Sequence, residues 1–161
     1  MVRTGYFDLP AIFEGYEVPE REDKKTSGDF ESLIVCYFCR WCTSAAADLA
    51  GTSRMQYPPN VRIITLPCTG KVDPLYVLTA FEKGADGVIV SGCIKQQCHY
   101  IDGNYKAERR IIFLKDILEE IGFGGNRLSM HFISASMAPT LVETVNEAVE
   151  RIKKLGPNPI K

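Results

Sequence analysis

The stretch IVCYFCRWCTSAAADLAG, residues 34 to 51, determines how the rest of the sequence is interpreted. It begins with a short apolar run, places three cysteines within seven residues, and continues into small residues typical of a helix. A buried strand that leads directly into a helix is typical of a parallel sheet. The question is why thiols gather where this strand ends.

Three further apolar runs resemble the first in length and in their content of β-branched residues, which favours strands buried in a parallel sheet. The four runs are LIVCYF (33–38), VRIITL (61–66), GVIVSG (87–92) and LSMHFISA (128–135). Helical patterns separate and follow them, at 44–49, from Asp73-Pro74 to Lys83-Gly84, at 105–121 and at 139–155. Strand and helix alternate four times, which predicts an α/β fold: a single open, doubly wound, mainly parallel four-stranded sheet.

The first 30 residues show no clear periodicity and are dense in charge between Glu17 and Lys25. We therefore expect an irregular N-terminal arm over 1–30, which either packs on the domain or a partner or is a frayed terminus. Residues 31–161 are predicted to form the α/β domain. The whole chain, 161 residues with 45% hydrophobic and 24% charged, has the size of one globular domain.

Composition excludes several classes of protein. A formal charge of −1 gives no electrostatic reason to expect binding to nucleic acid or to an anionic membrane. No apolar run reaches the roughly 18 residues of a membrane span, and the N-terminus lacks the apolar core of a signal peptide. We therefore expect a cytoplasmic protein. In a reducing cytosol, its six cysteines are expected to be metal ligands or redox groups instead of disulfides.

The predicted topology brings five of these cysteines together, because functional groups of open α/β sheets gather on loops after the carboxyl ends of the strands. Cys39 and Cys42 follow the first strand, and Cys68 follows the second. Cys93 and Cys98 follow the third. Cys36 lies within the first strand and is interpreted as a core residue, since free cysteine is among the most buried residue types.

Thiolates gathered in one pocket allow three interpretations: an iron–sulfur cluster, a structural zinc ion, or thiol–disulfide exchange by Cys39 and Cys42. The spacing x4 between Cys93 and Cys98 is irregular for zinc, and exchange leaves the other three cysteines unexplained. A 2Fe–2S cluster is preferred over 4Fe–4S, because the C-x3-C-P tail of ferredoxins is missing. Cys39 and Cys42 on one iron, with Cys93 and Cys98 on the other, would satisfy it, leaving Cys68 as a fifth candidate. The sequence does not identify the extra thiol.

Several neighbours of the cysteines allow more than one role. Gly70 and Gly92 suit close backbone approach and N–H donation to sulfur, or are plain turn glycines. Trp41 and Tyr100 would shield a cluster, contact a partner, or pack in the core. The two histidines are less promising as ligands: His99 ranks low, and His131 is expected to be a core residue with its polar atoms satisfied.

Six blocks of the sequence resemble those of a known family, the iron–sulfur delta (D) subunit of methyl-viologen-reducing hydrogenase. The resemblance covers about 33–158 and is carried by FCRWC, RMQYPPNVRII, PCTGKVDP, AFEKGADGVIVSGC, CHYIDGNYKAERR and ISAS. It implies a 2Fe–2S protein that passes electrons from a hydrogenase or formate dehydrogenase to the flavin-containing subunit of heterodisulfide reductase, where the flavin bifurcates them in methanogenesis. The family's cysteine pattern falls on Cys39, Cys42, Cys68, Cys93 and Cys98. The chain departs from it at Phe38, often a cysteine in the family, and at Ser44, commonly an aromatic residue.

We therefore expect an electron-transfer subunit with one 2Fe–2S cluster and no catalytic site of its own. No nucleotide-binding glycine motif and no nucleophile–base pair is found in the sequence. Lys106, Arg109, Arg110 and the segment 151–161 are hypothetical docking contacts. The alternatives are a small thiol–disulfide oxidoreductase and a zinc-stabilised adaptor subunit.

Overall fold

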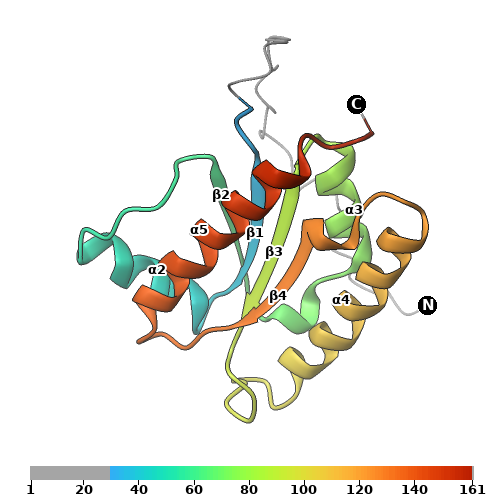
Figure 1. Ribbon diagram of the computed structural model, residues 1–161. Helices are drawn as coiled ribbons and strands as arrows, with labels where there is room; N and C mark the ends of the chain where they lie inside the picture. Colours follow the sequence, from blue (N-terminus) through green and yellow to red (C-terminus); the bar gives the residue numbers. More distant parts are fainter. Residues whose placement is uncertain (1–29, 161) are drawn as a thin grey trace, which may run out of the picture.

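A computed structural model describes residues 30–160, in which four parallel strands form one sheet with helices on both faces (Figure 1). The strand order is β2-β1-β3-β4, and every neighbouring pair is parallel. The strands are β1 Ile34–Cys39, β2 Val61–Leu66, β3 Gly87–Gly92 and β4 Leu128–Phe132. The predicted α/β class and the four-stranded parallel sheet are confirmed. The predicted arm, apart from Phe30, lies outside the described residues, as does Lys161.

Two helices cover each face of the sheet. The helices are α2 Thr43–Thr52, α3 Pro74–Glu82, α4 Gly103–Glu120 and α5 Ala138–Leu155, with single turns of 3₁₀ helix at η1 Thr69–Lys71 and η2 Gly125–Arg127. Side chains of α2 and α5 share one hydrophobic core, and those of α3 and α4 share the other. The Asp73 carboxylate accepts a hydrogen bond from the N–H of Leu75 (2.9 Å) and caps α3, as its position before Pro74 predicts.

The apolar run of β1 is unbroken because the strand is buried on both sides. All six of its residues are buried, and successive side chains alternate between the two cores. Val35 and Tyr37 pack against α3 and α4, whereas Ile34, Cys36 and Phe38 pack against α2 and α5. Burial raises the pKa of the Cys36 thiol, and the prediction that Cys36 is a core residue is confirmed.

Several details differ from the sequence prediction. The strand β2 was expected to be buried, but it is an edge strand in which Arg62, Ile63 and Thr65 are exposed. The strand β4 ends at Phe132, three residues before its predicted end, because the chain turns at Ser134–Met137, where Met137 N–H donates to the Ser134 carbonyl (3.1 Å). The helix α2 is longer than the predicted 44–49.

The expectation of a satisfied core histidine at position 131 is wrong. His131 lies on β4, the second edge strand, and is only partly buried. Its Nε2 atom is buried and has no hydrogen-bond partner within residues 30–160. Burial, followed by the positive charge of Arg151, lowers the pKa of this imidazole.

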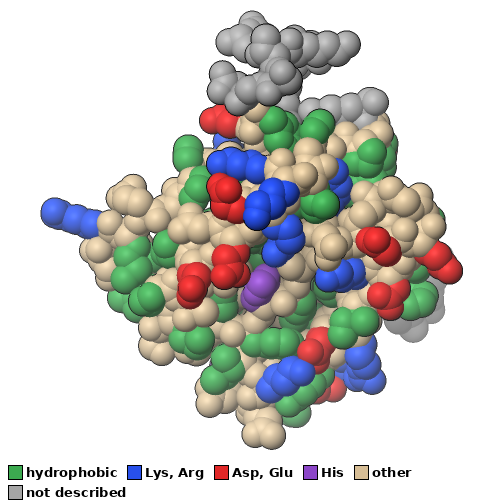
Figure 2. All heavy atoms as spheres, in the orientation of Figure 1, with side chains coloured by type: hydrophobic (Ala, Val, Ile, Leu, Met, Phe, Trp, Pro, Cys, Tyr) green, Lys and Arg blue, Asp and Glu red, His purple; other side chains and the backbone are tan. Residues whose placement is uncertain are grey.

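The face of the molecule that carries α5 and β4 shows cationic and anionic side chains side by side, without a field of one sign (Figure 2). This mixture agrees with the formal charge of −1. Within the described part of the chain, no helix is both long and apolar enough to cross a membrane.

Candidate metal centre

The cysteines gather at the point where the strand order reverses. From β1 the chain proceeds to β2 on one side and then to β3 on the other, and ligands of such sheets bind outside the carboxyl ends of these strands. Cys39 is the last residue of β1, Cys42 precedes α2, and Cys93 directly follows β3. In Figure 1 the loop between β3 and α4 extends below this edge of the sheet. The predicted convergence of loops is observed.

Three of the thiols form a close group. The Cys93 sulfur lies 3.0 Å from the Cys42 sulfur and 3.7 Å from the Cys39 sulfur. All three sulfurs lie within 4.8 Å of one another. Cys39 and Cys93 are buried, and Cys42 is partly exposed. We refer to Cys39, Cys42 and Cys93 as the sulfur triad.

Cys68 and Cys98 form a second group, with their sulfurs 4.0 Å apart. The structure thus places Cys93 with the two cysteines that follow β1, and Cys98 with the cysteine that follows β2. This differs from the pairing of Cys93 with Cys98 considered from sequence. The two groups are near enough to interact electrostatically. Burial, followed by the nearby Cys93, Cys39 and Cys98 thiols, raises the pKa of Cys42 to about 12.

Backbone N–H groups point at the sulfurs of this second pair. Gly70 N–H donates to the Cys68 sulfur (3.4 Å). Burial raises the pKa of Cys98, but hydrogen bonds from the backbone N–H groups of Tyr100, Asn104 and Gly103, together with a hydrogen bond from the Cys68 thiol, outweigh it, and the net pKa is lowered. Two of these donors belong to the first turn of α4, where free N–H groups and the helix dipole favour negative charge.

Two glycines allow the loops to approach each other. A Cβ atom on Gly103 would lie 2.3 Å from the Cys68 sulfur, and one on Gly70 would lie 2.8 Å from the Gly103 Cα atom. The predicted close approach and N–H donation are therefore observed at Gly70. Gly92 instead faces the Thr69 side chain, where a Cβ would lie 2.6 Å from Oγ1.

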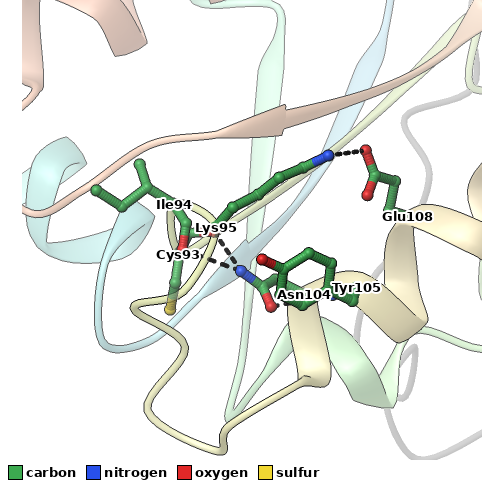
Figure 3. Close-up of polar contacts among 6 residues, drawn as sticks. All are labelled: Cys93, Ile94, Lys95, Asn104, Tyr105 and Glu108. Atoms are coloured by element: carbon green, nitrogen blue, oxygen red, sulfur yellow. Dashed lines mark hydrogen bonds and ion pairs between the residues drawn. The ribbon is translucent and has the colours of Figure 1, made fainter.

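Asn104 is a site residue that the sequence interpretation missed. It is completely buried, and its Nδ2 donates to the carbonyl oxygens of Cys93 and Ile94, both at 3.0 Å (Figure 3). Its own backbone N–H faces the Cys98 sulfur. Asn104 thus contacts both cysteines of the loop between β3 and α4, Cys93 and Cys98. The signal was the sequence Asp102-Gly103-Asn104, whose residue types favour a helix start two residues before the predicted one.

Of the three basic residues on α4 that were considered as docking contacts, two bind other groups of this chain. Lys106 forms an ion pair with Asp102 (3.0 Å). Arg110 donates to the carbonyl oxygens of Gly70 (2.8 Å) and Val72 (3.2 Å), which ties the Cys68 loop to α4. Arg109 is exposed.

The structure also shows the surroundings of Phe38 and Ser44, where the sequence departs from the family pattern, and of His99, the histidine considered as a ligand. Phe38 is fully buried in the core. The Ser44 hydroxyl lies 3.0 Å from that of Thr65 on β2. The ring of His99 stacks on Trp41 with centroids 4.1 Å apart, so the structure gives this histidine an aromatic contact.

The donor set fits a metal–sulfur centre. Two sulfurs bound about 2.3 Å from one tetrahedral metal ion lie about 3.8 Å apart. The Cys39–Cys93 and Cys68–Cys98 separations of 3.7 Å and 4.0 Å match that spacing. The same site fits thiol exchange poorly, because a reactive C-x-x-C pair needs a low thiol pKa. Burial raises the pKa of Cys39 to about 11, and that of Cys42 is raised as well.

Comparison with known proteins relates the sequence of this chain to a family. The model of the family described as "Methyl-viologen-reducing hydrogenase, delta subunit" matches residues 34–156. The chain is 53% identical over 131 residues to the iron-sulfur D subunit of the vhu F420-non-reducing hydrogenase of Methanocaldococcus jannaschii, covering 81% of this chain and 98% of the relative. The iron-sulfur D subunit of the F420-non-reducing hydrogenase of Archaeoglobus profundus is 45% identical over 131 residues, covering 81% and 96%.

A further relative carries the same region within a much longer chain. The A subunit of the ferredoxin/F(420)H(2)-dependent CoB-CoM heterodisulfide reductase of Methanosarcina acetivorans is 44% identical over 125 residues. The match covers 78% of this chain and 16% of the relative.

Proposed function

Because the chain belongs to the family of methyl-viologen-reducing hydrogenase delta subunits, we propose that it holds one 2Fe–2S cluster and relays single electrons within an oxidoreductase complex. The cluster ligands are four of Cys39, Cys42, Cys68, Cys93 and Cys98. The protein has no catalytic site of its own. It connects larger subunits that carry out the chemistry.

The observation that carries this proposal is the division of five sulfurs into a triad and a pair. A single zinc ion takes four donors around one point. A binuclear cluster takes two donors at each end, which supports Cys68 and Cys98 at one iron and two members of the triad at the other. On this assignment, the extra thiol belongs to the triad. The zinc adaptor is the second candidate, since thiolate donors suit zinc as well.

The residues of this chain would hold the cluster and adjust its charge. When bound, a 2Fe–2S cluster accepts one electron and returns it. The first turn of α4 and the Gly70 N–H donate hydrogen bonds to cysteine sulfurs, which stabilises added negative charge. Asn104 fixes the positions of Cys93 and Cys98, and burial of Cys39 and Cys93 keeps water away from that end.

The names of the relatives indicate the class of partner. The D subunits belong to hydrogenases, and the matching region also occurs inside the A subunit of a heterodisulfide reductase. We place the protein in the cytoplasm, accepting electrons from a hydrogenase or formate dehydrogenase and delivering them to the flavin-containing subunit of heterodisulfide reductase. The delivered electrons are used in flavin-based electron bifurcation.

The test is the metal content of protein purified without oxygen, together with the electron paramagnetic resonance spectrum after dithionite reduction. We expect about two iron and two sulfide per chain, with a spectrum of a reduced 2Fe–2S cluster. Cys68→Ser and Cys98→Ser should each remove or alter this spectrum, whereas Cys36→Ala should leave it unchanged. One zinc per chain and no iron, in protein handled anaerobically throughout, would replace this proposal with the adaptor.

A further inference from the structure

Four exposed side chains lie next to the cysteines in the sequence, and three of them contact one another. Trp41 comes from the loop after β1, and His99, Tyr100 and Ile101 come from the loop after β3. The His99 ring stacks on Trp41 (4.1 Å between centroids) and meets the Tyr100 ring edge-on (5.0 Å). Trp41 Nε1 donates to the Tyr100 hydroxyl at 3.4 Å. We refer to these four residues as the aromatic platform.

The platform is held by the same peptide groups that contact the sulfurs. The backbone N–H of Trp41 donates to the Cys39 sulfur, and that of Tyr100 donates to the Cys98 sulfur. Each of these two rings is therefore attached directly to a backbone group that touches the candidate metal centre. A molecule resting on the platform would therefore lie beside the residues that contact the Cys39 and Cys98 sulfurs.

Ile101 is the least expected residue of the platform. Its side chain is 86% exposed, and its φ angle is +72°. A β-branched residue rarely adopts this left-handed conformation, because its Cβ substituents crowd the backbone. A hydrogen bond from its N–H to the Cys98 carbonyl (3.0 Å) closes the turn that holds it there. An apolar side chain that is both strained and exposed stabilises neither the turn nor the core, and such strain is typical of functional sites.

The charge beside the platform favours a partner of a particular kind. Arg40 lies between Cys39 and Trp41, is exposed, and forms no side-chain hydrogen bond or ion pair with any of the described residues 30–160. The nearest acidic residue along the chain from the platform, Asp102, is paired with Lys106. The surface is therefore largely aromatic and apolar, with a positive charge that no side chain of residues 30–160 compensates. A second copy of this chain would bring Arg40 toward another Arg40, whereas a carboxylate at the rim of a different protein would compensate it.

We infer that the aromatic platform is the docking surface for the partner that accepts electrons from this protein. The partner presents an apolar surface bordered by carboxylates. Trp41 and Tyr100 supply rigid aromatic contact area of the kind enriched at binding hot spots, and Ile101 projects into the partner. This inference rests on the proposed function, because it takes the cysteines to hold an electron carrier.

The test uses Ile101→Asn, with Ile121→Asn as the matched control. Asparagine adopts positive φ more readily than isoleucine, so Ile101→Asn should relieve the strain and raise the midpoint of thermal unfolding by about 2 to 6 °C. It should also weaken binding to the partner by about tenfold or more, since a hot-spot contact is lost. Ile121, at the far end of α4, is 68% exposed with φ −80°. Its replacement should leave affinity within about twofold.

The probe is the A subunit of heterodisulfide reductase from the same organism, with binding measured anaerobically at two salt concentrations. Arg40→Glu should weaken binding and reduce its salt dependence. Iron content and the reduced spectrum are recorded for each variant, so a missing cluster refutes the proposed function and is distinguished from a failed docking surface. Unchanged affinity of cluster-loaded Ile101→Asn overturns the inference. So does absence of binding by the cluster-loaded wild type, or a wild-type homodimer that Ile101→Asn dissociates.

Discussion

Gly103 shows how closely the candidate metal centre depends on a single missing side chain. It is the first residue of α4, and it touches Gly70 so closely that a Cβ on either glycine would overlap the opposite loop. The contact holds the Cys68 sulfur against the start of the helix, whose N–H groups also face the Cys98 sulfur. No other residue type fits at position 103 without displacing a candidate ligand.

Gly103→Ala is therefore expected to abolish or greatly reduce cluster binding. The added methyl would lie 2.3 Å from the Cys68 sulfur, and relief of that overlap must move the loop or the helix, at a cost of about 1–3 kcal/mol. Gly51→Ala is the control, since a Cβ there meets nothing within 4 Å and should stabilise α2, by about 0.5–1 kcal/mol. Iron content and urea unfolding measure both effects. Full iron in Gly103→Ala would show that the loops tolerate the methyl.

At the level of single residues, the sequence predicts where the cysteines gather but not how they pair. Convergence follows from topology, because the carboxyl ends of parallel strands share one edge. The grouping of Cys93 with Cys42, and of Cys98 with Cys68, depends on the paths of two loops. Those paths depend on the close approach of Gly70 and Gly103, which lie far apart in the chain, so no local pattern shows it. They also depend on the hydrogen bonds from Asn104 to Cys93 and Ile94, whereas the local sequence there indicates only the start of a helix.

Among the secondary-structure elements, the edge strand β4 contains a buried polar atom, Nε2 of His131, that has no hydrogen-bond partner within residues 30–160. His131 is paired in register with buried Ser91, and Glu147 and Arg151 of α5 are the charged groups that affect it. Burial and Arg151 lower its pKa in the folded protein, and Glu147 opposes them. The imidazole therefore binds a proton more readily in the unfolded chain than in the folded one.

This difference predicts that the folded state loses stability as the pH falls. A group with a lowered folded pKa takes up its proton on unfolding once the pH drops below its unfolded pKa, about 6.5 for histidine. Urea unfolding at about pH 7.5, 6.5 and 5.5 should show stability falling, and His131→Leu should reduce the slope below about pH 6.5. Because both proteins have the same cysteines and the same carboxylates, their difference isolates the histidine. Parallel slopes would contradict the assignment.

The exposed face of β2 illustrates what local patterns do not reveal about an element. Residues 61–66 are apolar enough for a buried strand, and the bounds of this strand and of β3 match their prediction. Burial depends on strand order, which places β1 and β3 in the centre and leaves β2 and β4 at the edges. The alternation of α helices and strands predicts the fold class, but the order of strands is a property of the whole sheet.

Across the whole molecule, the carboxyl and amino ends of the strands carry different kinds of group. The sulfurs lie at the carboxyl ends of the strands. A buried polar network lies at the amino ends, and it holds the segment after α5 against the domain. Asp86 accepts hydrogen bonds from the N–H groups of Leu33 and Asn158, and Arg127 donates to the carbonyl oxygens of Leu155, Gly156 and Pro157. Part of the segment 151–161, considered from sequence to be a docking contact, therefore has a structural role.

Asn158→Ala tests this separation. The Nδ2 atom of Asn158 donates to the carbonyl oxygens of Phe81 (2.7 Å) and Ala85 (2.8 Å), and the residue is buried. The substitution removes both of these buried hydrogen bonds, which should destabilise the fold by about 2–3 kcal/mol in urea unfolding. Asn146→Ala, an exposed change on α5, should stay within about 0.5 kcal/mol. Because the network lies at the edge opposite the cysteines, the reduced spectrum and the affinity for the partner should not change in either variant. A shifted spectrum in Asn158→Ala would mean that the two edges are coupled through the sheet.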